Sequence, residues 1–116
     1  MDERLEKAFQ TANFMATLSN QKRAAFEEFN QKLIYYINGS SFIINKELIS
    51  FVKTLLEFDY KNNVVLIDNN QIPVVIENLE DFLKNIVKQY YESCVDYQVS
   101  YSKIKSKRKA EDLINL

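Results

Sequence analysis

The hydrophobic pattern of the first third of the chain has the spacing of an amphipathic helix. Apolar side chains recur every three or four residues from Leu5 to Tyr36, and no Gly or Pro interrupts them. This period predicts one long helix over residues 1–38, with a kink or a change of packing partner at the polar stretch 19–22. Gly39 is expected to cap the end of this helix, because glycine adopts the left-handed conformation there without strain.

The middle of the chain combines β-prone runs with one strongly apolar segment. Residues 41–44 are β-prone, and Asn45 offers an N-cap for a helix over residues 46–58. That helix is apolar on most of its circumference, which predicts that it forms the buried centre of the fold. The β-branched runs 64–67 and 72–76 flank an Asx-rich turn and predict a hairpin.

A heptad pattern occupies the last part of the chain. Asn78 is a candidate N-cap, and apolar residues then alternate at spacings of four and three. The expected seam consists of Leu83, Val87, Tyr90, Cys94, Tyr97, Tyr101 and Ile104. This pattern predicts a long helix over residues 78–115 that packs antiparallel against the N-terminal helix.

These patterns together predict an α+β fold that is mostly helical. The chain of 116 residues is expected to form a single domain over 1–116, with a long helix (1–38), a strand–helix–hairpin segment (41–76) and a second long helix (78–115). The strand and the hairpin should form a small three-stranded element, antiparallel or mixed. An apolar content of 47% and a charged content of 27% are those of an ordinary globular protein.

Charge and cysteine content bear on partners and compartment. The 15 basic and 16 acidic side chains nearly cancel, so net charge gives no argument for nucleic acid or a membrane surface. No apolar run approaches the roughly 20 residues of a membrane span. The single cysteine forms no internal disulfide, and the chain opens without a signal-peptide pattern. We therefore expect a reducing, cytoplasmic site of action.

The sequence lacks residues that several familiar catalytic sites require. The chain has no histidine, which excludes Ser–His and Cys–His nucleophile systems and histidine-based zinc sites. Its one glycine excludes a phosphate-binding glycine loop. Glu77, Glu80 and Asp81 could supply an acid/base pair, but acidic side chains at a helix start more often complement the helix dipole. We expect no catalytic residue, no metal ligand and no cofactor.

Two features of the last helix remain as candidate binding elements. Tyr91 lies off the seam, where an aromatic side chain makes a good interface anchor, whereas the other tyrosines are expected to fill the seam. Five positive charges then fall within seven residues near the helix end, where they complement the dipole and could also bind phosphate. The candidate partner-binding residues are Tyr91, Tyr97, Tyr101, Lys103, Lys105, Lys107, Arg108 and Lys109.

Several stretches give the chain a family resemblance. They run from Leu5 to Met15, from Phe42 to Val52, from Val65 to Asp68 and from Ile76 to Leu79. In overall pattern they resemble small uncharacterised proteins of large contractile-tailed phages that infect marine cyanobacteria. The resemblance covers nearly the whole chain and implies no known activity. It implies a viral origin and action inside an infected bacterium, in the host cell cytoplasm or in association with the virion.

The favoured hypothesis is a phage-encoded, non-catalytic protein–protein interaction factor. It would be a virion assembly factor, a minor structural component or a modulator of a host protein, and the last helix could self-associate along its heptad to give a homodimer or a higher oligomer. The alternative is a nucleic-acid-binding accessory protein that uses the basic segment 103–109. A third hypothesis, an enzyme with a carboxylate site, requires a concave pocket lined by Glu77, Glu80 or Asp81.

Overall fold

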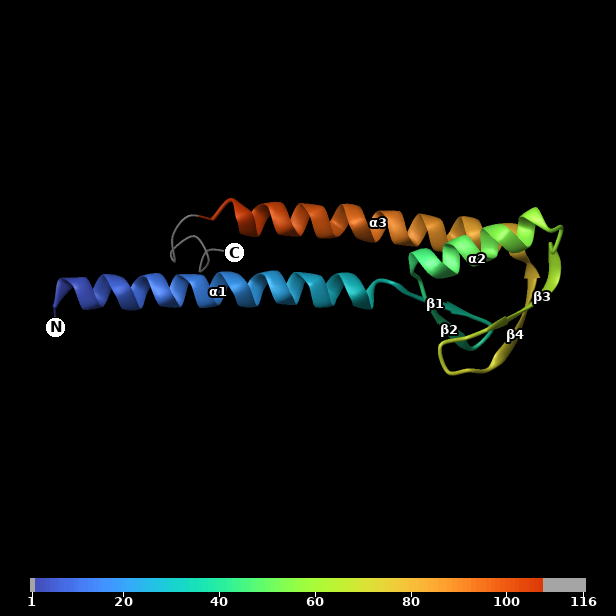
Figure 1. The fold of residues 1–116 in the computed structure, drawn as a ribbon, viewed down its shortest axis with the longest axis horizontal. Coiled ribbons are helices and arrows are strands. Elements are labelled where there is room, and N and C mark those ends of the chain that lie inside the picture. Colours follow the sequence, from blue (N-terminus) through green and yellow to red (C-terminus); the bar gives the residue numbers. More distant parts are fainter. Residues whose placement is uncertain (1, 108–116) are drawn as a thin grey trace. The chain divides into compact units, whose positions relative to one another are not determined.

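The computed structural model describes residues 2–107, which form three helices and two β-hairpins (Figure 1). Their order is α1 (Glu3–Gln31), β1 (Ile34–Ile37), β2 (Ser40–Ile43), α2 (Lys46–Glu57), β3 (Asn62–Ile67), β4 (Pro73–Asn78) and α3 (Leu79–Lys105). The predicted α+β fold, dominated by two long helices, is confirmed.

The chain divides into two compact units. Unit 1 comprises Met1–Phe29 and Val95–Leu116, and unit 2 comprises Asn30–Cys94. The boundaries between the units fall within α1 and α3, so each of these helices contributes to both. The expected organisation as a single domain over 1–116 stays a prediction.

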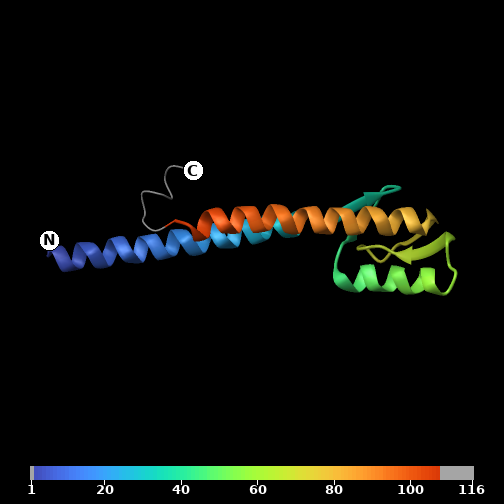
Figure 2. The ribbon, with the colours of Figure 1, turned by 90° about the horizontal axis from the view of Figure 1, so that it is seen from above.

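Unit 1 contains an antiparallel pair of helical segments, one from α1 and one from α3 (Figure 2). The ring of Phe29 stacks on that of Tyr97, with centroids 5.0 Å apart. Two turns earlier in α1, the Lys22 amino group lies 5.6 Å from the ring centre of Tyr101. Residues earlier in α1 therefore contact residues later in α3, which confirms the antiparallel packing expected of these helices.

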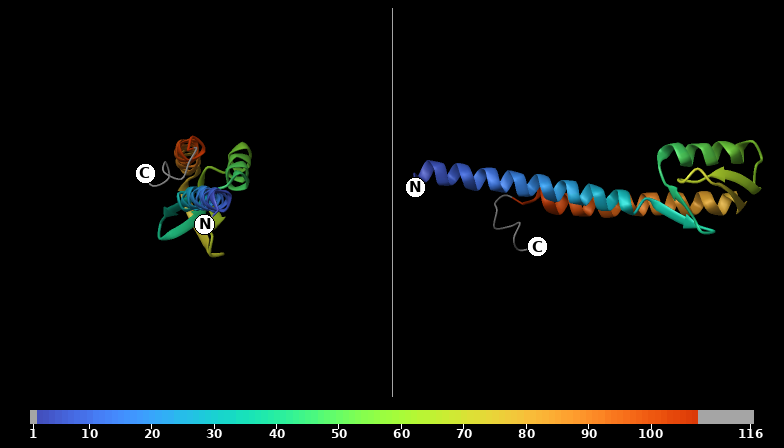
Figure 3. Two further views of the ribbon diagram at one scale, coloured as in Figure 1. Left: turned by 90° about the vertical axis from the view of Figure 1, so that its left-hand side faces the viewer. Right: turned by 90° about the horizontal axis from the view of Figure 1, so that it is seen from below.

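Unit 2 comprises both hairpins, α2 and the first part of α3 (Figure 3). Strands β1 and β2 are antiparallel, as are β3 and β4, and the two pairs form separate two-stranded sheets. In β3 and β4 alternate side chains are buried, as expected for sheet faces that differ in exposure. The core consists of Leu33, Phe42, Ile44, Val52, Val64, Leu66, Val74, Ile76, Leu79, Phe82 and Ile86.

The prediction of a three-stranded element is wrong, and so is the predicted end of the first helix. α1 ends at Gln31, and residues 34–37 form β1, which pairs with β2. This run is made of β-branched and aromatic residues, which favour a strand. Asn38 and Gly39 follow it with φ angles of 51° and 74°, the left-handed pair that a two-residue hairpin turn requires. Gly39 is therefore a turn residue and not a helix cap.

The predicted helix after Asn45 is confirmed, but its expected burial is wrong. The Asn45 side chain accepts a hydrogen bond from the Leu48 N–H at 2.7 Å, which makes it the N-cap of α2. Within α2 only Val52 is fully buried. Phe51 is 55% exposed, and Phe58, the C-cap, is 72% exposed. One side of α2 meets the core of unit 2, and the rest of its apolar surface faces solvent.

The start of α3 is confirmed, whereas its end and part of its seam differ from the prediction. Asn78 accepts from the Asp81 N–H at 3.1 Å. The helix ends at Lys105, and positions 108–115 of the expected helix lie outside the described residues. Val87 and Tyr101 of the predicted seam are exposed.

In the first part of α3 the buried residues lie one position earlier than the predicted seam. Phe82 and Ile86 are buried there, in place of Leu83 and Val87. There α3 does not pair with a single helix. The ring of Phe82 instead meets the rings of Tyr35 and Phe42 edge-on, at 5.6 Å and 5.3 Å. A heptad seam assumes a partner helix, so it places the buried face correctly only where such a partner exists.

Candidate interaction surfaces

Two of the candidate tyrosines pack within unit 1. The half-buried ring of Tyr97 stacks on Phe29 and lies 5.9 Å from the ring of Phe26. The ring of Tyr101 meets that of Tyr97 edge-on, with centroids 6.2 Å apart. The Lys22 amino group lies over the Tyr101 ring. Both rings therefore contact residues of the helix pair, although only Tyr97 has the burial expected of a seam tyrosine. Whether they also bind a partner stays a prediction.

Tyr91 lies in the part of α3 that belongs to unit 2. Its side chain is 69% exposed, and Val87 one turn earlier is 43% exposed. An exposed tyrosine beside an exposed valine has the chemistry of an interface anchor. Its role in binding a partner stays a prediction.

The basic segment is only partly within the described chain. Lys103 and Lys105 are exposed in the last turn of α3, and Lys107 is half-buried just beyond the helix. Arg108 and Lys109 lie outside the described residues. Single-strand binders usually place a free aromatic ring beside such charge, but the nearest ring, Tyr101, already contacts Tyr97 and Lys22.

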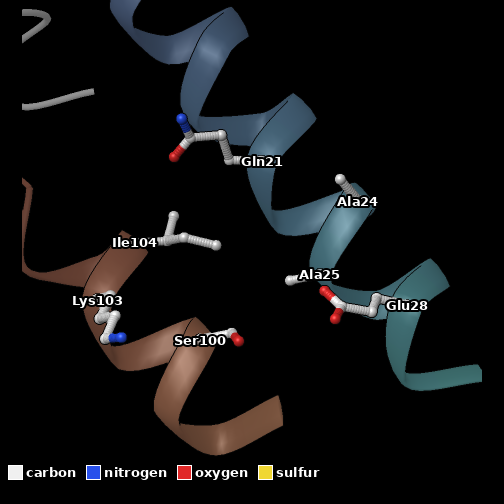
Figure 4. A pocket seen from close by; sticks show the side chains of 7 residues that line it. All are labelled: Gln21, Ala24, Ala25, Glu28, Ser100, Lys103 and Ile104. Atoms are coloured by element: carbon white, nitrogen blue, oxygen red, sulfur yellow. The ribbon is translucent and has the colours of Figure 1, made fainter. Parts of the chain in front are cut away.

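A groove with a volume of about 300 Å³ lies between the two helical segments of unit 1 (Figure 4). It is lined by Gln21, Ala24, Ala25, Glu28, Ser100, Lys103 and Ile104. The small side chains of Ala24, Ala25 and Ser100 leave the space open. The Gln21 Oε1 atom is buried and accepts no hydrogen bond from the described residues. The groove could receive an apolar side chain, and a donor that reached Oε1 would satisfy it.

A second, smaller hollow in unit 2 contains two of the three candidate carboxylates. It measures about 170 Å³ and is lined by Tyr35, Ile37, Asn38, Ile76, Glu77, Asn78, Asp81, Phe82 and Asn85. Sites for small molecules usually measure at least about 300 Å³. No group of three or more His, Cys, Asp or Glu side chains in the described part of the chain could hold a metal ion.

The polar side chains of this hollow already have structural roles. Asn78 caps α3, and Asn85 Nδ2 donates to the Tyr35 hydroxyl at 3.2 Å. Glu80, the third carboxylate, does not line the hollow. The pocket that the enzyme hypothesis requires therefore exists for Glu77 and Asp81, but it is small and offers no nucleophile beside them.

The exposed face of α2 carries two aromatic side chains. Leu48, Phe51, Leu55 and Phe58 are spaced three, four and three residues apart, so they share one side of the helix. We call these four residues the α2 stripe. Its two phenylalanines are more than half exposed, and its two leucines are half-buried. Tyr60, just beyond the helix, is 57% exposed.

The outer face of the β3–β4 hairpin is also apolar. Val65 pairs with Val75 across the two strands, and Ile67 pairs with Pro73. Val65, Ile67 and Val75 are each more than half exposed. Large contiguous apolar patches on the surface of a soluble protein commonly mark interaction sites.

The apolar composition of residues 46–58 already indicated an exposed apolar surface in this part of the chain. A helix that is apolar on most of its circumference, in a chain of this length, has more apolar surface than a small core can cover. The excess has to face solvent or a partner.

No family model, no curated protein and no solved structure matches this chain. Within the described residues, no helix combines the length and the apolar character needed to cross a membrane.

Proposed function

We propose that this chain is a phage-encoded, non-catalytic protein–protein interaction factor, which acts in the cytoplasm of the infected bacterium or in association with the virion. It either assists assembly, as a factor or minor component, or modulates a host protein. The observation that supports this proposal best is the α2 stripe, in which two phenylalanines remain exposed on a unit that has a well-buried core.

The energetics of the α2 stripe favour a partner. Full burial of a phenylalanine side chain is worth about 1.5–3 kcal/mol, so each half-exposed ring retains roughly 1 kcal/mol of unused burial. Phe51 and Phe58 lie two turns apart on one helix face, roughly 10 Å along the axis. Two aromatic anchors at that spacing fit an apolar groove on another protein.

The test is an affinity pull-down from infected-cell lysate with the tagged protein and two variants. F51D/F58D places two negative charges on the α2 stripe. K53D changes the charge of the same helix by the same amount, at an exposed position on a different face. The wild type and K53D should retain a partner that F51D/F58D loses, while circular dichroism shows the helix content of all three to be equal.

The identity of the retained protein distinguishes the two roles. Phage structural proteins would favour assembly, whereas a single host protein would favour modulation. Retention of every partner by F51D/F58D would contradict the assignment to the α2 stripe. Partners lost on nuclease treatment would instead favour the nucleic-acid alternative, in which binding weakens steeply with salt and with charge reversal at Lys105, Lys107 and Arg108.

A further inference from the structure

The turn between β1 and β2 contains the one asparagine of the chain that precedes a glycine. Asn38 and Gly39 are both exposed, with φ angles of 51° and 74°. A Cβ atom at Gly39 would meet no other atom within 4 Å, so the space around this residue is open. Glycine also has no side chain that could hinder an approach to its own backbone nitrogen. The Asn38 side chain can therefore reach this nitrogen without a steric barrier.

The two groups that such an approach would bring together are the side-chain amide of Asn38 and the backbone N–H of Gly39. In the described part of the chain, neither group makes a hydrogen bond. The hairpin explains this, because the strand pairing beside the turn joins Ile37 to Ser40 and leaves the two turn residues outside it. A reaction between the two groups therefore breaks no hydrogen bond of the fold at either of them.

The asparagines of the other hairpin turn are held differently. The N–H that would attack Asn69 is that of Asn70, which donates to Asp68 Oδ1 at 2.8 Å. The N–H that would attack Asn70 is that of Gln71, which donates to the Asp68 carbonyl oxygen at 3.1 Å. The two asparagines that cap α2 and α3 use their side chains as hydrogen-bond acceptors. The fold thus restrains these asparagines and leaves Asn38 unrestrained.

We propose that Asn38–Gly39 is a site of spontaneous deamidation. The Gly39 nitrogen attacks Cγ of Asn38 and gives its proton to a base in the solvent. A five-membered succinimide ring forms as the Cγ–Nδ2 bond breaks and ammonia leaves. Water then opens the ring: cleavage of the bond from Cγ to nitrogen gives aspartate, and cleavage of the bond from the backbone carbonyl carbon to nitrogen gives isoaspartate. Ring closure rotates the Asn38 backbone, which a local opening of the exposed end of this short hairpin permits.

Either product changes the surroundings of the turn. The new carboxylate lies at the hollow that Asn38 lines together with Glu77 and Asp81, so it adds a third negative charge there. Isoaspartate also inserts one atom into the main chain, and a lengthened turn no longer fits the pairing of Ile37 with Ser40. The β1–β2 hairpin of the modified chain should therefore be less stable.

This site goes beyond the proposed function, since it lies outside the α2 stripe and needs no partner protein. Loss of the partner surface would not prevent the reaction, and an inert Asn38 would not remove the partner surface. The two proposals can therefore fail independently.

Peptide mapping by mass spectrometry tests the proposal on the full-length protein, incubated at mildly alkaline pH. The peptide with Asn38 should gain the mass of an NH-to-O exchange before any other asparagine peptide does. It should elute as two species, one of which matches the peptide of an Asn38→Asp variant while the other contains isoaspartate. Earlier modification of another asparagine would overturn the proposal. Formation of aspartate without isoaspartate would overturn it too, because direct hydrolysis of the amide gives aspartate alone.

Gly39→Ala is the matched variant, because it retains the Asn38 amide and the net charge but adds a Cβ atom beside the attacking nitrogen. Deamidation of Asn38 should slow by at least about fivefold, which corresponds to about 1 kcal/mol of activation free energy. The same comparison in urea removes any effect of the substitution on folding. An unchanged rate in both conditions would contradict attack by the Gly39 nitrogen.

The wild type in urea also separates the contribution of the fold from that of the dipeptide. Asn69 and Asn70 should react faster relative to Asn38 in the unfolded chain, because the N–H groups that attack them are then released from Asp68. The same relative rates in the folded and unfolded chain would contradict the selection of Asn38 by the hydrogen bonds of the fold.

Discussion

Gly39 adopts a φ of +74° in the turn between β1 and β2. A Cβ atom at this position would meet no other atom within 4 Å, so a side chain there costs conformational energy and not a clash. We predict that Gly39→Ala lowers the free energy of unfolding by about 1 kcal/mol, measured by urea denaturation. Asn38→Gly is the control, since both residue types tolerate the left-handed conformation at that position. Equal stability of Gly39→Ala and wild type would contradict the turn geometry.

Asp68 organises the turn between β3 and β4. It is 7% exposed, and its Oδ1 atom accepts hydrogen bonds from the N–H groups of Asn70 and Ile72, each at 2.8 Å. Its Oδ2 atom is buried without a hydrogen-bond partner in the described part of the chain. The Oδ1 atom therefore stabilises the turn through two hydrogen bonds, to which Oδ2 adds none within the described residues.

We predict that Asp68→Ala lowers the free energy of unfolding by about 1–3 kcal/mol, because two backbone donors lose their acceptor. Asp68→Asn retains an acceptor oxygen and should lose less. Urea denaturation of both variants measures the difference. If Asn proved as harmful as Ala, the charge and not the acceptor geometry would be the stabilising feature.

Gln89 connects elements that are distant in sequence within unit 2. Its Nε2 group donates to the carbonyl oxygens of Lys32 and Ile34, each at 2.8 Å. The Ser93 hydroxyl donates to the Gln89 carbonyl at 2.7 Å and lies 3.5 Å from that of Lys32. α3 thereby fixes the segment through which the chain leaves α1 and enters β1.

We predict that Gln89→Leu lowers the free energy of unfolding by about 1–3 kcal/mol, since two hydrogen bonds are lost. Amide exchange should accelerate in β1 and β2 more than in β3 and β4, as measured by mass spectrometry. Gln98→Leu is the matched control, because the Gln98 side chain donates to Ser102 on the exposed surface of the same helix. An equal effect of the two variants would mean that Gln89 does not anchor the β1–β2 hairpin.

Local sequence signals were sufficient for some elements and ambiguous for others. Asn45 and Asn78 cap the helices that they were expected to cap. Residues 33–37 fit two patterns, because Leu33 and Tyr36 continue the helical spacing while the run 34–37 is β-prone and precedes Asn-Gly. Asn38 and Gly39 favour the strand, because two adjacent left-handed residues end a helix and form the turn of a hairpin.

The candidate surfaces were harder to predict than the elements. Spacing alone placed Tyr97 in the helix pair and Tyr91 outside it. The groove of unit 1 depends on Ala24, Ala25 and Ser100, which are small residues from two helices that meet only in the fold. Hydrophobic periodicity indicates which side chains avoid water. It does not indicate whether the same chain covers them, so the exposed α2 stripe was mistaken for core.

At the scale of the whole molecule, burial is distributed unevenly between the two units. Most of the fully buried apolar side chains belong to unit 2. In the described part of unit 1, the fully buried apolar side chains are those of Ala25 and Ile104. Helices with so little packing are marginal in water, because most helical stability in proteins comes from an apolar face that is packed. The described part of unit 1 should therefore open locally more readily than unit 2.

This uneven burial predicts that amide exchange distinguishes the two units. The amides of residues 3–20 should exchange faster than those of β3 and β4, because the local opening of a helix with few buried apolar side chains costs little free energy. Hydrogen exchange followed by mass spectrometry measures both regions at once. Equal protection of the two regions would contradict this difference in local stability, because it would mean that the contacts of α1 stabilise it as well as the core of unit 2 stabilises its hairpin.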